Sequence, residues 1–393
     1  MNLLMLSNLY PKDIENEIRS KLKFNMYDAA NELQWNIIDG LVENRYFENV
    51  KLCNLIPIDS WPGYYKDHYV KKHLFNVDGK SSSVSIPFCN IKLLKHKSIE
   101  YSFINNAVRL FDDDCVILIY SLNATFLKAV KKLKGKCPNL RCIAVVADLP
   151  QFTTNDNNIF RRFYRMRNVA NVQSLIKYVD GFIFLTEHMS KKLNVDKPFK
   201  VVEGIAKENP YRNSELRNVD EVSVLYSGSL NKLYGVMHLI DAFELIRGDN
   251  FRLYLCGMGD AEKEIKEMAS RDNRIVFLGK ITHDEVLKLQ CKAHVLVNPR
   301  QNIHEFTKYS FPSKNLEYLA SGTPVVAYNL DGIPKEYDRY LIYPQDDSIE
   351  ALAYAIERAA KVKDFDKITD AVLLYKNKRF QSKKIIDLFE ELR

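Results

Sequence analysis

Apolar residues follow two alternating patterns along the chain. Short continuous apolar runs are typical of buried parallel strands, whereas apolar residues spaced three or four apart indicate amphipathic helices. The runs predict strands over residues 3–6, 51–56, 116–120, 142–146, 181–185, 200–202, 222–226, 252–256, 275–278, 295–298 and 324–327. Helical spacing predicts helices over residues 236–246, 261–270, 284–290 and 312–320. The alternation of strands and helices predicts an α/β chain with parallel sheets.

The alternation is interrupted once, and the interruption divides the chain in two. Residues 207–217 are polar, contain Pro210 and show no sustained period, so we predict an exposed connector there. We expect one α/β domain over residues 1–207 and a second over residues 208–375. Residues 376–393 resume a helical spacing, and we expect this C-terminal helix to pack back on the first domain.

Composition places the chain among ordinary globular proteins, with 46% hydrophobic and 27% charged residues. Its seven cysteines are odd in number and widely scattered, which indicates reduced thiols in the cytoplasm. No apolar run approaches the roughly 18 residues of a membrane span. We therefore expect a cytoplasmic protein that is soluble or peripheral on the inner face of the plasma membrane.

Positive charge is concentrated in the first half of the chain. Residues 1–209 contain 30 Lys and Arg against 22 Asp and Glu, whereas the remainder contains 27 against 28. Four arginines are interleaved there with aromatic residues, namely Arg161, Arg162, Arg165 and Arg167. Such a run predicts contact with an anionic membrane surface, although a solvated helix face explains it equally. No RNA-recognition motif accompanies the run, so we expect no nucleic-acid partner.

The segment over residues 311–327 carries the most informative chemistry. Pro312 suits the first position of the helix predicted there, because its missing N–H is harmless at a helix start. The helix brings Ser313, Lys314 and Glu317 to one side, because residues three or four apart are neighbours on a helix. Free amides at the helix start and the lysine favour a phosphate, and the carboxylate accepts hydrogen bonds from sugar hydroxyls. A capped, solvated first turn with a weak surface ion pair is the alternative.

A second loop adds to this site. Gly228 and Ser229 follow a predicted strand and precede a helix, where small residues let the backbone approach a phosphate, and Lys232 supplies charge. Two better-known phosphate motifs are absent. The Gly257-Met-Gly259 turn lacks the third glycine of a dinucleotide fingerprint, and the segment ending in Gly79-Lys80-Ser81 lacks the first glycine of a P-loop.

Together these segments resemble the donor-binding domain of retaining glycosyltransferases of family 4, which have the GT-B fold. The landmarks, in order, are Tyr226-Ser-Gly-Ser-Leu230, Leu255-Cys-Gly-Met-Gly259, Val276-Phe-Leu-Gly279, Ala293-His-Val-Leu-Val-Asn-Pro299 and Leu316-Glu-Tyr-Leu-Ala-Ser-Gly-Thr-Pro-Val-Val326. The resemblance implies two Rossmann-like domains that face one another across a cleft. It also implies that Glu317 binds the donor ribose, that Lys280 and Ile281 lie beside the base, and that the Gly228 loop faces the diphosphate.

The chain departs from the family pattern at three positions. Tyr309 stands where members commonly carry a first glutamate, and the nearest acid is Glu305. Ser229 and Tyr234 stand where members carry basic residues of the diphosphate loop. Phosphate binding then depends on Lys232, Lys314 and helix N-termini. This pattern resembles a subgroup of capsule and exopolysaccharide enzymes with a Phe-Pro-Ser-Lys signature.

Asp148 is the candidate polar group of the first domain. It follows the predicted strand over residues 142–146, at the end where parallel sheets bind ligands. We predict that Asp148, Lys232 and Lys314 take part in the reaction, with Asp148 on the acceptor side. A turn cap is the alternative role for Asp148.

These observations predict a retaining hexosyltransferase that moves a sugar from a nucleotide diphosphate-sugar, with UDP favoured, to a saccharide or lipid-linked saccharide acceptor in surface polysaccharide synthesis. Fixed amides and lysines stabilise the leaving diphosphate in this scheme, so we expect neither a metal ion nor a cofactor. Three alternatives remain. They are an inactive homologue that serves a glycosyltransferase complex as a saccharide-binding or scaffold subunit, a sugar-nucleotide epimerase, and, last, a nucleic-acid-binding module.

Overall fold

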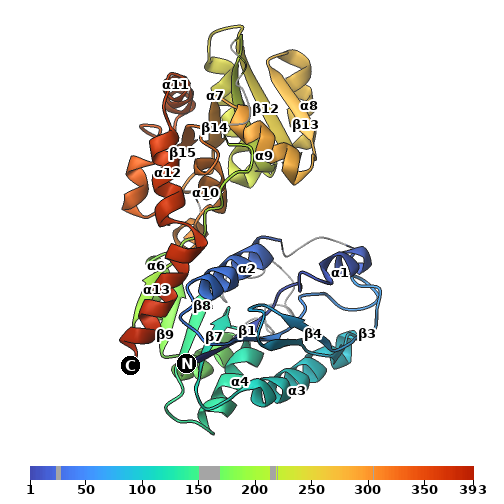
Figure 1. Cartoon of the computed structure of the whole chain (residues 1–393). Coiled ribbons are helices and arrows are strands. Elements are labelled where there is room, and N and C mark those ends of the chain that lie inside the picture. The colour runs from blue at the N-terminus through green and yellow to red at the C-terminus, as the bar shows by residue number, and fades with distance from the viewer. Residues whose placement is uncertain (24–27, 150–168, 213–217, 219, 304) are drawn as a thin grey trace. The chain divides into compact units, whose positions relative to one another are not determined.

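The chain forms two compact units (Figure 1). The computed structural model describes residues 1–23, 28–149, 169–212, 218, 220–303 and 305–393. The first unit comprises Met1–Glu203 together with Lys378–Arg393, and the second comprises Gly204–Asn377. The division after Glu203 lies close to the boundary expected at residues 207/208, and the C-terminal helix belongs to the first unit.

The first unit is built on an eight-stranded sheet of order β10-β9-β8-β7-β1-β2-β5-β4. Its strands are β1 (Asn2–Ser7), β2 (Val50–Asn54), β4 (His73–Asn76), β5 (Ser82–Ser85), β7 (Cys115–Tyr120), β8 (Cys142–Val146), β9 (Gly181–Phe184) and β10 (Phe199–Val201). Neighbouring strands are parallel except β4, which pairs antiparallel with β5. Strands β7 and β8 are buried throughout, as expected for the centre of a parallel sheet with helices on both faces.

Helices surround this sheet (Figure 1). They are α1 (Glu15–Lys21), α2 (Asp28–Glu43), α3 (Lys92–Leu110), α4 (Ala124–Lys134), α6 (His188–Leu193) and α13 (Lys378–Glu391), with the 3-10 turn η1 (Ile176–Tyr178). Helix α13 packs tightly on α2 because Gly40 has no side chain: a Cβ there would lie 2.3 Å from the Lys378 carbonyl oxygen. The Ser382 hydroxyl also donates a hydrogen bond of 3.2 Å to the Ile37 carbonyl.

A short antiparallel pair, β3 (Tyr69–Val70) and β6 (Phe88–Cys89), stands beside the main sheet of the first unit. It joins residues 61–72 to the start of α3, since Trp61 also forms a β-bridge with Ile91. These two segments expose large apolar side chains and lysines. They are Trp61, Tyr64, Tyr69, Leu93 and Leu94, together with Lys66, Lys71, Lys72, Lys92 and Lys97. We refer to this set as the aromatic–basic surface.

The second unit is built on a five-stranded sheet of order β13-β12-β11-β14-β15, with all neighbours parallel. Its strands are β11 (Val222–Ser229), β12 (Phe251–Met258), β13 (Ile275–Gly279), β14 (Val295–Asn298) and β15 (Val325–Ala327). From β11 the chain moves outward through β12 to β13, and it then returns to β14 and moves outward on the other side. The strand order therefore reverses between β11 and β14, where open α/β sheets bind ligands beyond the carboxyl ends of their strands.

The helices of the second unit are α7 (Val236–Leu245), α8 (Glu262–Arg271), α9 (His283–Lys292), α10 (Ser313–Leu319), α11 (Ile349–Ala359) and α12 (Asp366–Tyr375). Short 3-10 turns are η2 (Lys232–Tyr234), η3 (Glu305–Tyr309) and η4 (Lys335–Arg339). Helix α9 begins with a capping box, in which Thr282 and Glu285 each bond the other's backbone amide. Among the described helices of both units, none combines the length and apolar character needed to cross a membrane.

Candidate functional site

Lys314 and Gly228 are in contact at the carboxyl edge of the second sheet. A Cβ added to Gly228 would lie 2.4 Å from Lys314 Cε and 3.4 Å from Nζ, so the lysine side chain runs over the glycine backbone. The backbones of Gly228 and Gly257 are also in close contact, because a Cβ added to Gly257 would lie 1.7 Å from the Gly228 carbonyl oxygen. Glycine at 228 and 257 thus leaves room for a lysine directly above the ends of β11 and β12.

Glu317 lies one turn further along α10 and is half-buried. Gln290 of α9 donates a hydrogen bond of 2.5 Å from Nε2 to Glu317 Oε1, and Nε2 lies 3.4 Å from Ser227 Oγ. The Gln290 side chain has no exposed surface. It therefore fixes the carboxylate at the top of β11, and one Glu317 oxygen remains for another donor such as a sugar hydroxyl.

The charges of Lys314 and Glu317 both affect the thiol of Cys256, which lies near the end of β12. Burial raises the pKa of the Cys256 thiol to about 11, while the Lys314 charge lowers it and the Glu317 charge raises it. The lysine and the carboxylate therefore lie within electrostatic range of the same buried atom, as the spacing of residues 314 and 317 on α10 predicted.

Tyr318 attaches α10 to β11. The Ser227 amide donates a hydrogen bond of 2.9 Å to the Tyr318 hydroxyl, which donates one of 3.0 Å to the Ser227 carbonyl oxygen. Tyr318 is fully buried. These two bonds set the rotation of the helix, and with it the direction of Lys314 and Glu317.

Four other predicted donor residues lie at the ends of strands or helices. Ser229 is exposed at the end of β11, where its carbonyl oxygen accepts a hydrogen bond of 2.7 Å from Tyr226. Ser313 is exposed at the start of α10. Lys280, exposed, and Ile281, half-buried, follow directly after β13. The structure thus places these residues at the carboxyl edge of the sheet, on three different connections.

Two predicted residues have partners of their own. The Lys232 ammonium forms an ion pair with Glu264 of α8, and this carboxylate raises the pKa of the lysine. Glu305 is exposed at the start of η3, where it accepts a hydrogen bond of 3.3 Å from the Tyr309 hydroxyl. The charge of Lys232 is therefore already partly balanced within the protein.

Arg300 was missed by the sequence analysis. It follows β14 and is half-buried, with its guanidinium 4.8 Å from the centre of the Phe306 ring and 5.6 Å from that of Tyr234. Burial lowers the pKa of this guanidinium, while the Tyr234 and Tyr226 hydroxyls raise it. Gln290 was missed as well. In the sequence, the only signal for either was a polar residue within or beside an apolar run.

Asp148 follows β8 in the first unit. Its side chain keeps an exposed face, yet protein surrounds it closely enough that burial raises the pKa of its carboxyl. The charge on Asp148 also adds to the effect of burial in raising the pKa of Tyr120, at the end of the neighbouring strand β7. The four arginines expected at a membrane, Arg161, Arg162, Arg165 and Arg167, lie outside the described residues.

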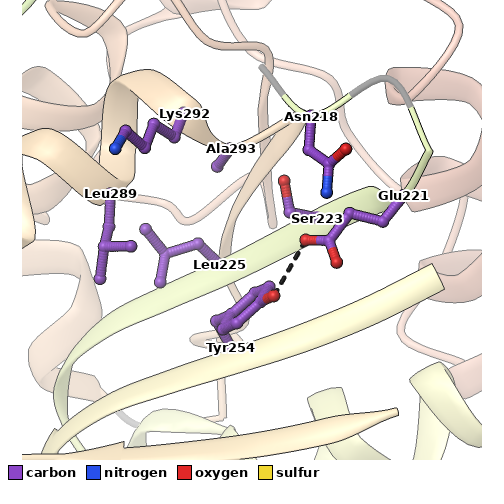
Figure 2. Close-up of a pocket in the computed structure, with 8 residues that line it drawn as sticks. All are labelled: Asn218, Glu221, Ser223, Leu225, Tyr254, Leu289, Lys292 and Ala293. Carbon is purple, nitrogen blue, oxygen red and sulfur yellow. Dashed lines mark hydrogen bonds between the residues drawn. The ribbon is translucent and has the colours of Figure 1, made fainter. Parts of the chain in front are cut away.

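A pocket of about 340 Å³ opens at the opposite end of the second sheet. Figure 2 shows its lining, which comes from the start of β11, from β12 and from α9, with Tyr254 bonded to Glu221 at 2.9 Å. The lining residues are Asn218, Glu221, Ser223, Leu225, Tyr254, Leu289, Lys292 and Ala293. None of the predicted donor residues is among them, so this pocket is separate from the Gly228–Lys314–Glu317 site.

Comparison with known proteins finds a family model that matches most of the second unit. Residues 221–361 match the family model described as Glycosyl transferases group 1. The second unit carries a group 1 glycosyltransferase domain. The match spans the sheet of the second unit and α10, and therefore Gly228, Lys314 and Glu317. None of the curated protein sequences matches the chain.

Solved structures resemble the whole chain at low sequence identity. The chain is similar to sucrose-phosphate synthase from Thermosynechococcus elongatus, with 15% identity, a TM-score of 0.64, and 100% and 99% of the two chains covered. It is similar to an alpha,alpha-trehalose-phosphate synthase (UDP-forming) from Burkholderia xenovorans in complex with glucose-6-phosphate, with 11% identity, a TM-score of 0.66 and both chains covered to 100%. It is also similar to Anabaena HepE in complex with UDP, with 13% identity, a TM-score of 0.60 and both chains covered to 100%. The fold is GT-B, and the predicted fold class is confirmed.

Proposed function

We propose that this protein is a retaining hexosyltransferase that uses a nucleotide diphosphate-sugar, UDP-sugars first, as its donor. The observation that carries the proposal is the convergence of Gly228, Lys314 and Glu317 within the group 1 glycosyltransferase domain. The structures of Anabaena HepE with UDP and of a UDP-forming synthase support UDP as the nucleotide.

Each group of the site has a role in this reaction. Departure of the nucleoside diphosphate develops negative charge, which the Lys314 ammonium over Gly228 stabilises. The free oxygen of Glu317 accepts a hydrogen bond from a ribose hydroxyl, while Gln290 holds the other. We propose that side chains and backbone amides carry this stabilisation without a metal ion or a cofactor, and that the anomeric configuration is retained.

We propose a saccharide or lipid-linked saccharide acceptor in surface polysaccharide synthesis, with Asp148 as its polar contact. Two observations in the first unit support this proposal. The pKa of the Asp148 carboxyl is raised by burial, as is common for groups that handle protons in sites. The aromatic–basic surface combines exposed aromatic side chains with lysines, the composition that binds anionic lipid headgroups. It supports a peripheral position on the inner membrane face.

An inactive homologue that acts as a saccharide-binding or scaffold subunit is the second candidate. Tyr309, Ser229 and Tyr234 in place of charged residues favour it, and so does the pairing of Lys232 with Glu264. The two candidates differ in turnover, since only the transferase releases nucleoside diphosphate from a nucleotide-sugar.

Thermal unfolding with UDP, GDP, ADP and their sugars tests the donor site. A ligand at about 100 times its Kd stabilises the folded state by about 2.7 kcal/mol. We expect UDP or a UDP-sugar to raise the unfolding temperature of the protein, and Glu317→Ala to lose most of that shift. Glu267→Ala, which removes an exposed glutamate from α8, is the matched control and should keep the shift.

The outcomes separate the parts of the proposal. An unchanged shift in Glu317→Ala places the donor elsewhere, and the absence of a shift with every nucleotide rejects the donor function. Sugar transfer or donor hydrolysis that stops when EDTA removes divalent ions rejects the metal-independent scheme. Binding without any turnover favours the inactive homologue.

A further inference from the structure

Arg300 carries a positive charge that the described part of the protein does not balance. No ion pair joins its guanidinium to a carboxylate among the described residues, and Nε is buried without a hydrogen-bond acceptor. An arginine stays protonated inside proteins. A half-buried, unpaired cation lowers the stability of the folded state. A bound anionic ligand at this edge of the sheet would balance the charge.

The neighbours of Arg300 hold the side chain but cannot neutralise it. Phe306 and Tyr234 present their ring faces to the guanidinium, and the Ser310 hydroxyl accepts a hydrogen bond of 3.1 Å from Nη2. Aromatic faces attract a cation without removing its charge. The planar group is thereby fixed in orientation, and its remaining N–H groups can form the paired hydrogen bonds that arginine makes to phosphate.

The backbone places Arg300 beside the loop that follows β11. Gly235, with φ of 81°, ends η2, and a Cβ on it would lie 2.2 Å from the Pro299 carbonyl oxygen. Pro299 immediately precedes Arg300. This close contact presses the end of β14 against the turn that contains Tyr234. Arg300 therefore stands at the point where strand order reverses, on the edge that also carries Gly228 and Lys314.

We propose that Arg300 binds the diphosphate of the donor and supplies the positive charge that Ser229 and Tyr234 do not. This inference rests on the proposed function and adds a residue to its site. Tyr234 keeps a different role, since its ring supports the guanidinium instead of contributing a cation of its own. Two cations then face the leaving group, Arg300 from the end of β14 and Lys314 from the start of α10.

Arg300→Met tests the proposal because methionine keeps an apolar stem between the two rings and removes only the charge and the donors. We expect UDP binding, measured by titration calorimetry, to weaken 10- to 100-fold, the usual value of hydrogen bonds to a charged group. Uridine, which lacks phosphate, should bind as it does to the natural protein. Arg300→Lys should recover part of the affinity, since it restores a point charge without the planar fork.

The unfolding temperature without ligand separates a binding role of Arg300 from a structural one, because loss of a structural residue would lower it. Removal of an unpaired cation should leave the unfolding temperature of Arg300→Met unchanged or raise it. The matched control is Arg252→Met, whose arginine donates to the Asp249 and Phe251 carbonyl oxygens at the start of β12. This control should keep full UDP affinity.

Each result bears on one proposal. Equal UDP affinity in Arg300→Met and the natural protein overturns the role of Arg300 while the donor function stands. If no nucleoside diphosphate binds the natural protein, the donor function fails, and inorganic pyrophosphate still decides the role of Arg300. If pyrophosphate stabilises the natural protein but not Arg300→Met, an anion site at Arg300 is supported. If pyrophosphate stabilises both proteins, or does not stabilise the natural protein, the anion site is rejected.

Discussion

Replacement of Asp148 by asparagine should raise the stability of the protein and lower its activity. The stability effect follows from the raised pKa of the Asp148 carboxyl. A carboxyl whose folded pKa lies above its unfolded value costs no stability at low pH, where it is protonated in both states. The cost develops as pH rises above the unfolded pKa, and it reaches its full value above the folded pKa. Asparagine cannot ionise, so Asp148→Asn should remove this cost.

We therefore expect Asp148→Asn to unfold at a higher temperature than the natural protein at pH 7, with a difference that shrinks toward pH 4. The same variant should lose most sugar transfer if Asp148 contacts the acceptor. Unfolding temperatures at several pH values, with transfer assayed at pH 7, check both statements. A variant that is destabilised at neutral pH, or fully active, contradicts the role of Asp148.

At the residue scale, the sequence revealed those members of the site that lie on one helix or in one loop. Lys314 and Glu317 are neighbours through helix geometry, and the structure places both near Cys256. Gln290 and Arg300 reach the site only through the packing of α9 and the end of β14. Their distance from residues 313–317 in the sequence hides this contact. The roles of all these residues remain predictions.

At the scale of elements, the approach of β11 to β12 makes a sharp prediction for Gly257. Its partner in the strand pairing is Gly228, and a Cβ on Gly257 would lie 1.7 Å from the Gly228 oxygen. Gly279, at the end of β13, also has positive φ, 65°, but the nearest atom to an added Cβ is 3.9 Å away. Gly257 has φ of 141°, so alanine carries a backbone cost at both positions, but only Gly257 also lacks space for the added Cβ.

Gly279→Ala should cost about 1 kcal/mol for its backbone conformation. Gly257→Ala should cost about 3 kcal/mol or more, because the strands must separate as well. Urea unfolding of the two variants, followed on the transition of the second unit, measures the difference. Similar losses for both would show that the strand ends are not packed this closely.

The predicted elements were accurate where a strand is buried and apolar. Strands β8 and β14 have the bounds expected from their apolar runs, 142–146 and 295–298. Strands β11 and β12 continue to Ser229 and Met258, beyond their apolar runs, because they remain paired as far as residues 229 and 258. The pair β3 and β6 was not predicted, since two-residue strands on an exposed surface leave no period in the sequence.

At the scale of the whole molecule, the chain passes between the units twice. It leaves the first unit after Glu203 and returns at Lys378. The Ala206 amide donates a hydrogen bond of 2.7 Å to the Lys376 carbonyl oxygen, so the two passages run together on the second unit. The sequence indicated the first passage by its polar connector, whereas the return was visible only as a change of helical period near residue 376.

The aromatic–basic surface predicts where the molecule meets a membrane. Leu93, which is 89% exposed, stands beside Lys92 at the start of α3. Apolar side chains that enter the headgroup region and lysines that attract anionic lipid act together, and each basic residue near the surface contributes about 1 kcal/mol. Leu93→Glu removes an apolar anchor and adds a repelled charge, so it should weaken binding about tenfold or more.

Co-sedimentation with vesicles of phosphatidylglycerol and phosphatidylcholine measures this effect. The natural protein should bind the anionic vesicles, release them at about 0.5 M salt because screening weakens the attraction, and ignore pure phosphatidylcholine. Leu374→Glu changes a leucine of α12 that is 59% exposed in the second unit, and it should bind like the natural protein. Equal binding of both variants would move the membrane contact away from α3, and no binding by the natural protein would leave a soluble saccharide as the acceptor.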